Sequence, residues 1–441
     1  MESGAEASDG YGPFAWDPER REEFEQNAAT GTSHVLYALS PGGVIATAER
    51  VDAWRPEIER AAERHAVDAD RLEALVFLES AGRPEVIAGE TPEAAAGLGQ
   101  ILPSTATDLL GMEVDLPQSI KLTKQISRAA ADGDDAKAEK LARERARIDQ
   151  RFDPEAALDG AGRYLAIAEE RLGADDLATV SYHMGIGNLE SVIEAYGGDS
   201  EDLSYAQLFF DSAPDLNPEA YEILSGFADD SSLYLWRILA SERIMRHWRG
   251  DRDRLERTAE LATQKATLEE LYHPEGENEV FDDDGEVEGA TDEGALLPLP
   301  PEGGPGWAVD EQTGELAPRL EREPELYRAL RPEALATLAF IGATVERLSE
   351  AEEPLRVTSA VRDLEYQALL AASNPEATQE YSLHTTGYSF DVLRRYQNDR
   401  QAEAFQFALD RLRALAVIDY AVEPRAIHVT VSPLGGALLA P

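Results

Sequence analysis

The chain has 441 residues, of which 40 are basic and 86 acidic, so its formal net charge is -46. A phosphate backbone would repel such a chain, and this excludes a general nucleic-acid-binding protein. The absence of cysteine excludes disulfides, a thiolate nucleophile and cysteine-ligated zinc, whereas a hydrophobic content of 43% supplies sizeable cores.

No apolar run approaches the ~18 residues that a membrane-spanning helix needs, so we expect no transmembrane segment. The N-terminus has no basic region followed by an apolar stretch, so no secretory leader is visible. Either the protein stays inside the cell or a leader precedes this numbering.

The length corresponds to roughly two to three domains. Residues 1–45 are mixed, polar and glycine-rich, and we interpret them as an N-terminal extension. From 46 to 272 the apolar residues recur at helical intervals, which predicts a mainly α-helical domain. Within it, 117–150 is a charged segment with a narrow apolar stripe, and we expect an inserted helical hairpin there. No internal repeat is visible.

Residues 273–317 carry many acids at first and then a proline- and glycine-rich stretch. This composition favours a solvated linker over the alternative, a calcium-binding loop. Residues 318–441 contain two amphipathic helical patterns and short β-rich runs, of which the last two are separated by a turn. They predict a small α+β domain with an antiparallel sheet.

One carboxylate in the helical region has the pattern of a general acid. Leu72, Leu75 and Val76 form an apolar helical stripe, and Glu79 continues it at the end of the helix. A carboxyl group against apolar walls has a raised pKa, which is the requirement for an acid that works near neutral pH. The alternative is an ordinary helix-terminal glutamate that faces solvent.

Three ordered blocks around Glu79 resemble the signature blocks of soluble lytic transglycosylases in the lysozyme superfamily. The family has a Glu-Ser pair, then Gly-Leu-Met-Gln with Pro-x-Thr-Ala, then Tyr-Asn-Ala-Gly-x-Gly-Asn. The order and spacing agree apart from the hairpin insertion. The corresponding residues here are Glu79-Ser80, Gly97-Leu98-Gly99-Gln100, Pro103-Ser104-Thr105-Ala106 and Tyr182-His183-Met184-Gly185-Ile186-Gly187-Asn188.

The resemblance implies a mainly α, lysozyme-like fold and a single catalytic carboxylate, Glu79. This residue would protonate the glycosidic oxygen between MurNAc and GlcNAc, and then act as base on the MurNAc C6 hydroxyl to close a 1,6-anhydro ring. His183 replaces the usual Asn and Gly99 replaces the usual Met. The resemblance also implies substrate contacts. Gln100 and Tyr182 would hold the sugar and orient Glu79, and Ser80 would support Glu79 or the N-acetyl group. Gly97 would let the backbone approach the saccharide closely, and Asn188 would make a further contact.

A second set of residues has the composition of a metal site. His384 and Asp391 stand seven residues apart around a glycine, and His428 lies in a later β-rich run. Two histidines and one aspartate are suitable ligands for Zn²⁺ and leave an open position for water. The alternative for a histidine in a strand is a packed core residue.

The pattern Ser-x-His-x-x-Gly-x-x-x-Asp with a distant strand His resembles the zinc D-Ala-D-Ala peptidase family, which shares its fold with the Hedgehog signalling domain. The resemblance implies an α+β zinc-peptidase-like fold with His384, Asp391 and His428 as ligands. Arg362 is then a clamp for a peptide carbonyl or carboxylate, and Ser382 contacts substrate.

This second resemblance is incomplete at the catalytic base. The family usually has a Glu three residues before the last His, where this chain has Arg425. Glu423 stands two residues earlier, and a turn at Pro424 would bring it back toward the metal. We therefore expect Glu423 to be the base; otherwise the domain binds zinc or peptide without cleaving.

Together the two resemblances predict a bifunctional peptidoglycan-degrading enzyme that cuts glycan strands and, with Zn²⁺, stem or cross-link peptides. The alternative keeps the lytic transglycosylase and reduces the C-terminal domain to a binding module. A third possibility is a scaffold without catalysis. The substrate implies a periplasmic or secreted location in the cell envelope. The sequence leaves the oligomeric state, the native metal and the scissile peptide bond open.

Overall fold

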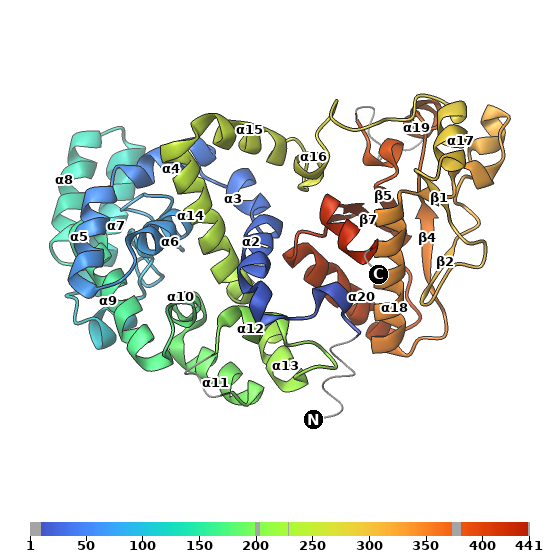
Figure 1. The fold of residues 1–441 in the computed structure, drawn as a ribbon. Coiled ribbons are helices and arrows are strands. Elements are labelled where there is room, and N and C mark those ends of the chain that lie inside the picture. Colours follow the sequence, from blue (N-terminus) through green and yellow to red (C-terminus); the bar gives the residue numbers. More distant parts are fainter. Residues whose placement is uncertain (1–9, 199–202, 228, 373–380, 440–441) are drawn as a thin grey trace. The chain divides into compact units, whose positions relative to one another are not determined.

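The computed structural model describes residues 10–198, 203–227, 229–372 and 381–439. The chain is mostly helical, with a small mixed sheet in its C-terminal part (Figure 1). It forms two compact units. The first, here called the helical unit, comprises Val35–Ser212 and Asn217–Arg257; the second, the sheet unit, comprises the described residues up to His34, Ala213–Leu216 and the chain from Thr258 onward. No helix among the described residues is long and apolar enough to cross a membrane.

The helical unit is built around α6 (Ala69–Ser80), which is buried along most of its length. Asp68 caps its first turn by accepting the amide protons of Asp70 and Arg71. The helix ends at Ser80, and Ala81 and Gly82 follow it with positive φ angles. Gly82 has φ +71°, and its added Cβ would meet the backbone of α4 at 2.9 Å, so a glycine is required two residues after the end of the helix that carries Glu79.

Other helices surround α6. The long helix α14 (Tyr234–Gly250) packs along it, as do α4 (Val44–Asp52) and α5 (Arg55–His65). The charged segment 117–150 forms the expected hairpin of α7 (Leu116–Ala131) and α8 (Asp135–Ala146). The remaining helices are α3 (His34–Ala38), α9 (Pro154–Leu172), α10 (Asp175–Met184), α11 (Ile186–Tyr196), α12 (Tyr205–Phe210), α13 (Pro218–Gly226) and α15 (Arg252–Ala262).

The sheet unit contains a five-stranded sheet in the order β2-β4-β5-β7-β6. The four strands of this sheet that lie within 318–441 pair antiparallel, as expected. β2, from the segment expected to be a linker, adds to β4 in parallel and makes the sheet mixed. The helices α18 (Pro332–Ser349) and α20 (Asp399–Ala414) pack on each other and against the strands. The strands are β2 (Trp307–Val309), β4 (Leu355–Ser359), β5 (Ser389–Leu393), β6 (Ile418–Val422) and β7 (Ala426–Val431); smaller elements are α16 (Glu269–Tyr272), α17 (Asp284–Asp292), α19 (Leu364–Ala371) and a second sheet of β1 (Leu297–Pro298) and β3 (Ala329–Leu330).

The segment 273–317, which we expected to be a linker, is folded. It contains α17, β1 and β2, and three of its apolar residues, Phe281, Val287 and Leu296, are buried in one core cluster. The backbone of Phe281 also accepts and donates hydrogen bonds with Leu364 and Thr385. The linker prediction was wrong because composition averages over positions, whereas a few well-placed apolar residues anchor an otherwise acidic stretch.

The unit boundaries also differ from the expected domain limits of 45 and 272. Residues 10–34 do not form a separate extension; α2 (Arg21–Gly31) packs against α20 within the sheet unit. A Cβ on Gly31 would clash with the backbone carbonyl of Arg413, so the two helices approach closely there. Residues 1–9 of the expected extension lie outside the described part of the chain. The helical unit is thus inserted, in the sequence, between two parts of the sheet unit.

Candidate functional site

Glu79 lies one residue before the end of α6, and its carboxyl group is only partly exposed. The hydroxyl of Tyr234, the first residue of α14, donates a hydrogen bond to Glu79 Oε1 at 2.7 Å. At the other end of the same helix pair, Arg249 donates to both oxygens of the buried Glu73. These two polar contacts fix α14 along α6 and so hold the tyrosine against the carboxyl group.

Burial raises the pKa of Glu79 to about 7, and the hydrogen bond from Tyr234 opposes the shift without cancelling it. No other carboxylate among the described residues contributes to this shift. Burial therefore moves the pKa of Glu79 into the range that suits a general acid near neutral pH.

Tyr182 and His183 lie on α10, close to this carboxyl group. The hydroxyl of Tyr182 donates to the carbonyl of Gly99 at 2.6 Å, and burial, followed by the charge of Glu79, raises its pKa. A Cβ at Gly99 would lie 2.9 Å from that hydroxyl, so glycine leaves room for the tyrosine. The ring of His183 stacks on Tyr234 with centroids 5.2 Å apart.

The other residues predicted to contact saccharide make local structural contacts. Ser80 is buried and its hydroxyl donates to the carbonyl of Val76 in the same helix. The amide nitrogen of Gln100 donates to two backbone carbonyls, and that of Asn188 donates to the carbonyl of Met184. Gly97 has φ +78°, and its added Cβ would clash with the Arg151 carbonyl, so protein packing already accounts for this glycine.

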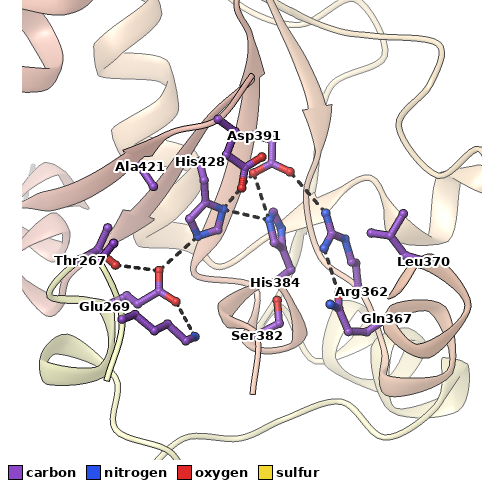
Figure 2. A pocket seen from close by; sticks show the side chains of 13 residues that line it. Thr267, Glu269, Arg362, Gln367, Leu370, Ser382, His384, Asp391, Ala421 and His428 are labelled. Atoms are coloured by element: carbon purple, nitrogen blue, oxygen red, sulfur yellow. Dashed lines mark hydrogen bonds and ion pairs between the residues drawn. The ribbon is translucent and has the colours of Figure 1, made fainter. Parts of the chain in front are cut away.

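In the sheet unit, three side chains far apart in the sequence meet on the central strands. Asp391 on β5 and His428 on β7 are directly opposite each other in the antiparallel register, so their side chains share one face. His384 comes from the turn Leu383–Thr386 just before β5. The structure thus brings the three predicted metal ligands together, as Figure 2 shows.

The three candidate donor atoms form a small triangle. His384 Nε2 lies 3.1 Å from Asp391 Oδ1 and 3.2 Å from His428 Nδ1, and the third side measures 2.9 Å. In a tetrahedral zinc site, metal–ligand distances near 2.0 Å place neighbouring donors about 3.3 Å apart. The observed spacing fits three corners of such a site.

The protonation of His384 also fits a ligand. Its Nδ1 lies 2.8 Å from the carbonyl of Ala360, which can only accept, so Nδ1 carries the proton and Nε2 keeps its lone pair. Burial and then the charge of Arg362 lower the pKa of His384 to about 4, which keeps the ring neutral.

The three donors line a cavity of about 210 Å³. Arg362 enters it from the segment after β4, with its guanidinium bonded to Asp391 Oδ2, Ser359 and Gln367. Two more residues singled out from the sequence line the cavity: Glu423, the expected base, and Ser382, the expected substrate contact. The further lining residues are Lys265, Ala266, Thr267, Glu269, Gln367, Leu370 and Ala421.

Sequence reasoning missed two residues of these sites. Tyr234 had no assigned motif, and Glu269, whose carboxylate approaches His428, stood in a segment assigned to the first domain. Both contacts join residues far apart in the chain, and no local pattern indicates such a pairing. Neither the scan of protein-family models nor the search of curated proteins found a match to this chain.

Proposed function

We propose that the protein is a bifunctional peptidoglycan-degrading enzyme of the cell envelope, in which the helical unit is a lysozyme-like lytic transglycosylase and the sheet unit a zinc-peptidase-like domain. The observation that carries the first activity is the carboxyl group of Glu79, which lies at the end of a buried helix, is held by the Tyr234 hydroxyl at 2.7 Å and has its pKa raised by burial. The observation that supports the second is the donor triangle of His384, Asp391 and His428 beside a cavity.

In the proposed glycan reaction, the protonated Glu79 transfers its proton to the glycosidic oxygen as the C1–O bond breaks. The resulting carboxylate then takes the proton of the MurNAc C6 hydroxyl while that oxygen bonds to C1. Atoms balance without water, and Glu79 ends protonated for another cycle. A pKa near 7 suits both steps, because a general acid–base catalyst works best when its pKa is close to the working pH.

Tyr234 supports this assignment. Its hydroxyl holds one carboxyl oxygen at 2.7 Å and leaves the other oxygen to meet substrate. Tyr182, on α10, donates its hydroxyl proton to the Gly99 carbonyl and not to Glu79. We infer that its ring forms part of the buried surroundings of the Glu79 carboxyl group.

In the sheet unit, a bound Zn²⁺ would polarise a peptide carbonyl and lower the pKa of a water molecule. His384, Asp391 and His428 would hold the ion. Arg362 is buried and its side chain lines the cavity beside Asp391. We infer that its guanidinium group binds a peptide carbonyl or carboxylate.

Glu423 is the base that we propose for peptide hydrolysis. It follows β6 in the hairpin and pairs by its backbone with Ala426, two residues before His428 on β7. Because side chains alternate along a strand, Glu423 and Ala421 belong to the face of the hairpin that carries His428, and both line the cavity. Arg425, at the usual base position, is exposed and does not appear in the cavity wall.

A second candidate function keeps the transglycosylase and makes the sheet unit a module that binds metal or wall peptide. The observation that favours it is Arg425, since a cation cannot serve as the base. Zinc-dependent hydrolysis of stem peptides that is lost in Glu423→Gln would support the peptidase. Peptide binding without hydrolysis would support the binding module.

The glycan activity is tested by comparing Glu79→Gln with Glu90→Gln, an exposed acid in the loop after α6. We expect the first variant to lose release of soluble fragments from purified peptidoglycan and the second to retain it. Equal release by both variants would overturn the role of Glu79.

A further inference from the structure

Glu269, at the start of α16, lies behind one of the candidate metal ligands. Its side chain is buried, with 6% of the residue exposed, and its Oε2 lies 3.4 Å from His428 Nε2 (Figure 2). The same oxygen accepts the hydroxyl proton of Thr267 at 3.0 Å, and the other oxygen accepts from Lys265 at 2.5 Å. Both oxygens of this carboxylate are therefore held in place.

We propose that Glu269 is a positioning residue of the metal site: it accepts the Nε2 proton of His428 and so turns Nδ1 toward Asp391 and His384, where a metal ion would replace the Nδ1 proton. The proposal rests on the proposed metal site of the sheet unit. Carboxylates that hold the distal N–H of a ligating histidine fix its tautomer and ring orientation and raise its basicity. His384 has the corresponding contact with the Ala360 carbonyl, so each histidine would have its distal nitrogen held.

The position of Glu269 excludes it as a metal ligand in this arrangement. It meets the imidazole at Nε2, whereas His428 faces Asp391 and His384 through Nδ1. The carboxylate therefore lies on the far side of the ring from the donor triangle. It acts on the metal through His428, and the assignment of Glu423 as the base is unaffected.

The segment around Glu269 is itself anchored within the sheet unit. Lys265 also bonds Glu270 at 2.9 Å and the backbone carbonyl of Tyr381 at 2.9 Å. The amide of Leu268 donates to Asp419 on β6 at 2.7 Å. These contacts tie the segment to the strand next to β7 and keep the carboxylate beside the histidine.

The alternative is that Glu269 serves only as an ion-pair partner of Lys265. Glu270 provides a matched control for this alternative, since it is equally buried, adjacent in sequence and bonded to the same lysine, but has no contact with His428. A role in the ion pair predicts similar effects at both positions. A role in positioning predicts an effect at Glu269 alone.

The test compares Glu269→Gln, Glu269→Asp and Glu270→Gln in the full-length protein. Zinc affinity is measured by competition with a chromophoric chelator, and folding is checked by thermal unfolding of the metal-free proteins. We expect Glu269→Gln to weaken zinc binding about 10- to 100-fold and Glu270→Gln to change it less than about threefold. Glu269→Asp keeps the charge beside Lys265 but shortens the reach, so we expect it to weaken zinc binding as well.

Nitrogen NMR of the His428 ring gives a readout that a merely structural role would not change. In the zinc-bound wild type we expect a protonated Nε2 with the shift of an N–H that is bonded to a carboxylate. In the folded Glu269 variants we expect the shift of a more weakly bonded N–H, because the neutral hydroxyl of Thr430 remains 3.3 Å from Nε2. Wild-type affinity in both Glu269 variants, or equal losses at Glu269 and Glu270, would overturn the positioning role. Failure of the wild type to bind zinc would instead overturn the proposed metal site itself.

Discussion

Replacing Glu79 by glutamine is expected to stabilise the folded protein at alkaline pH while it abolishes glycan cleavage. The pKa of Glu79 is raised from the ordinary 4.5 to about 7. Below the unfolded pKa the carboxyl group is protonated in both the folded and the unfolded state, so it costs nothing. As the pH rises, the unfolded chain releases the proton first, and the free energy of unfolding falls until the folded pKa is passed.

The magnitude follows from the size of this shift. One pKa unit corresponds to about 1.4 kcal/mol, so the ionised Glu79 lowers the free energy of unfolding by about 3 kcal/mol near pH 8. Glutamine keeps an oxygen that accepts from Tyr234 and never ionises. The stability gained by Glu79→Gln should therefore grow from near zero at about pH 4 to about 3 kcal/mol at about pH 8.

The assay is urea unfolding of the wild type and the variant at both pH values, followed by tryptophan fluorescence. Glu63→Gln, at an exposed position of α5, is the control, and we expect its effect to be the same at both pH values. A stability difference for Glu79→Gln that does not change with pH would refute the argument that burial raises the pKa of this carboxyl group.

Three further predictions concern other contacts. Tyr234→Phe removes the hydrogen bond that opposes the pKa shift of Glu79, so the alkaline limb of the pH–rate profile of glycan cleavage should move to higher pH; an unchanged limb would contradict this. Gly31→Val places a side chain against the Arg413 backbone and should lower the free energy of unfolding by about 1–3 kcal/mol, seen as a lower urea midpoint. Zinc should raise the thermal midpoint of the wild type but not that of His384→Ala, and an equal rise in both would place the metal elsewhere.

The sequence predicted well those features that depend on neighbouring residues. The helix that carries Glu79 near its end was predicted from the apolar stripe of Leu72, Leu75 and Val76, which is a local pattern. The hairpin at 117–150 and the last two strands were predicted for the same reason. The resemblance implied that His384, Asp391 and His428 share one metal site, and the structure brings their donor atoms together.

Features that depend on distant residues were not predictable in this way. Tyr234 reaches Glu79 because α14 packs along α6, and Glu269 reaches His428 because its segment is fastened to β6. The folding of 273–317 depends on a buried cluster that includes Phe281 and Val361, which are far apart in the chain. Such contacts are set by tertiary packing, and neither periodicity nor composition encodes them.

The most direct test of the account is digestion of purified peptidoglycan by the wild-type protein, with mass spectrometry of the soluble products in the presence and absence of a zinc chelator. If Glu79 closes the anhydro ring and the sheet unit is a zinc peptidase, 1,6-anhydro-MurNAc ends should appear in both samples. Shortened or uncrosslinked stem peptides should appear only without the chelator. Reducing MurNAc ends in place of anhydro ends would contradict the single-carboxylate mechanism assigned to Glu79. Intact peptides in both samples would contradict the peptidase activity assigned to the sheet unit.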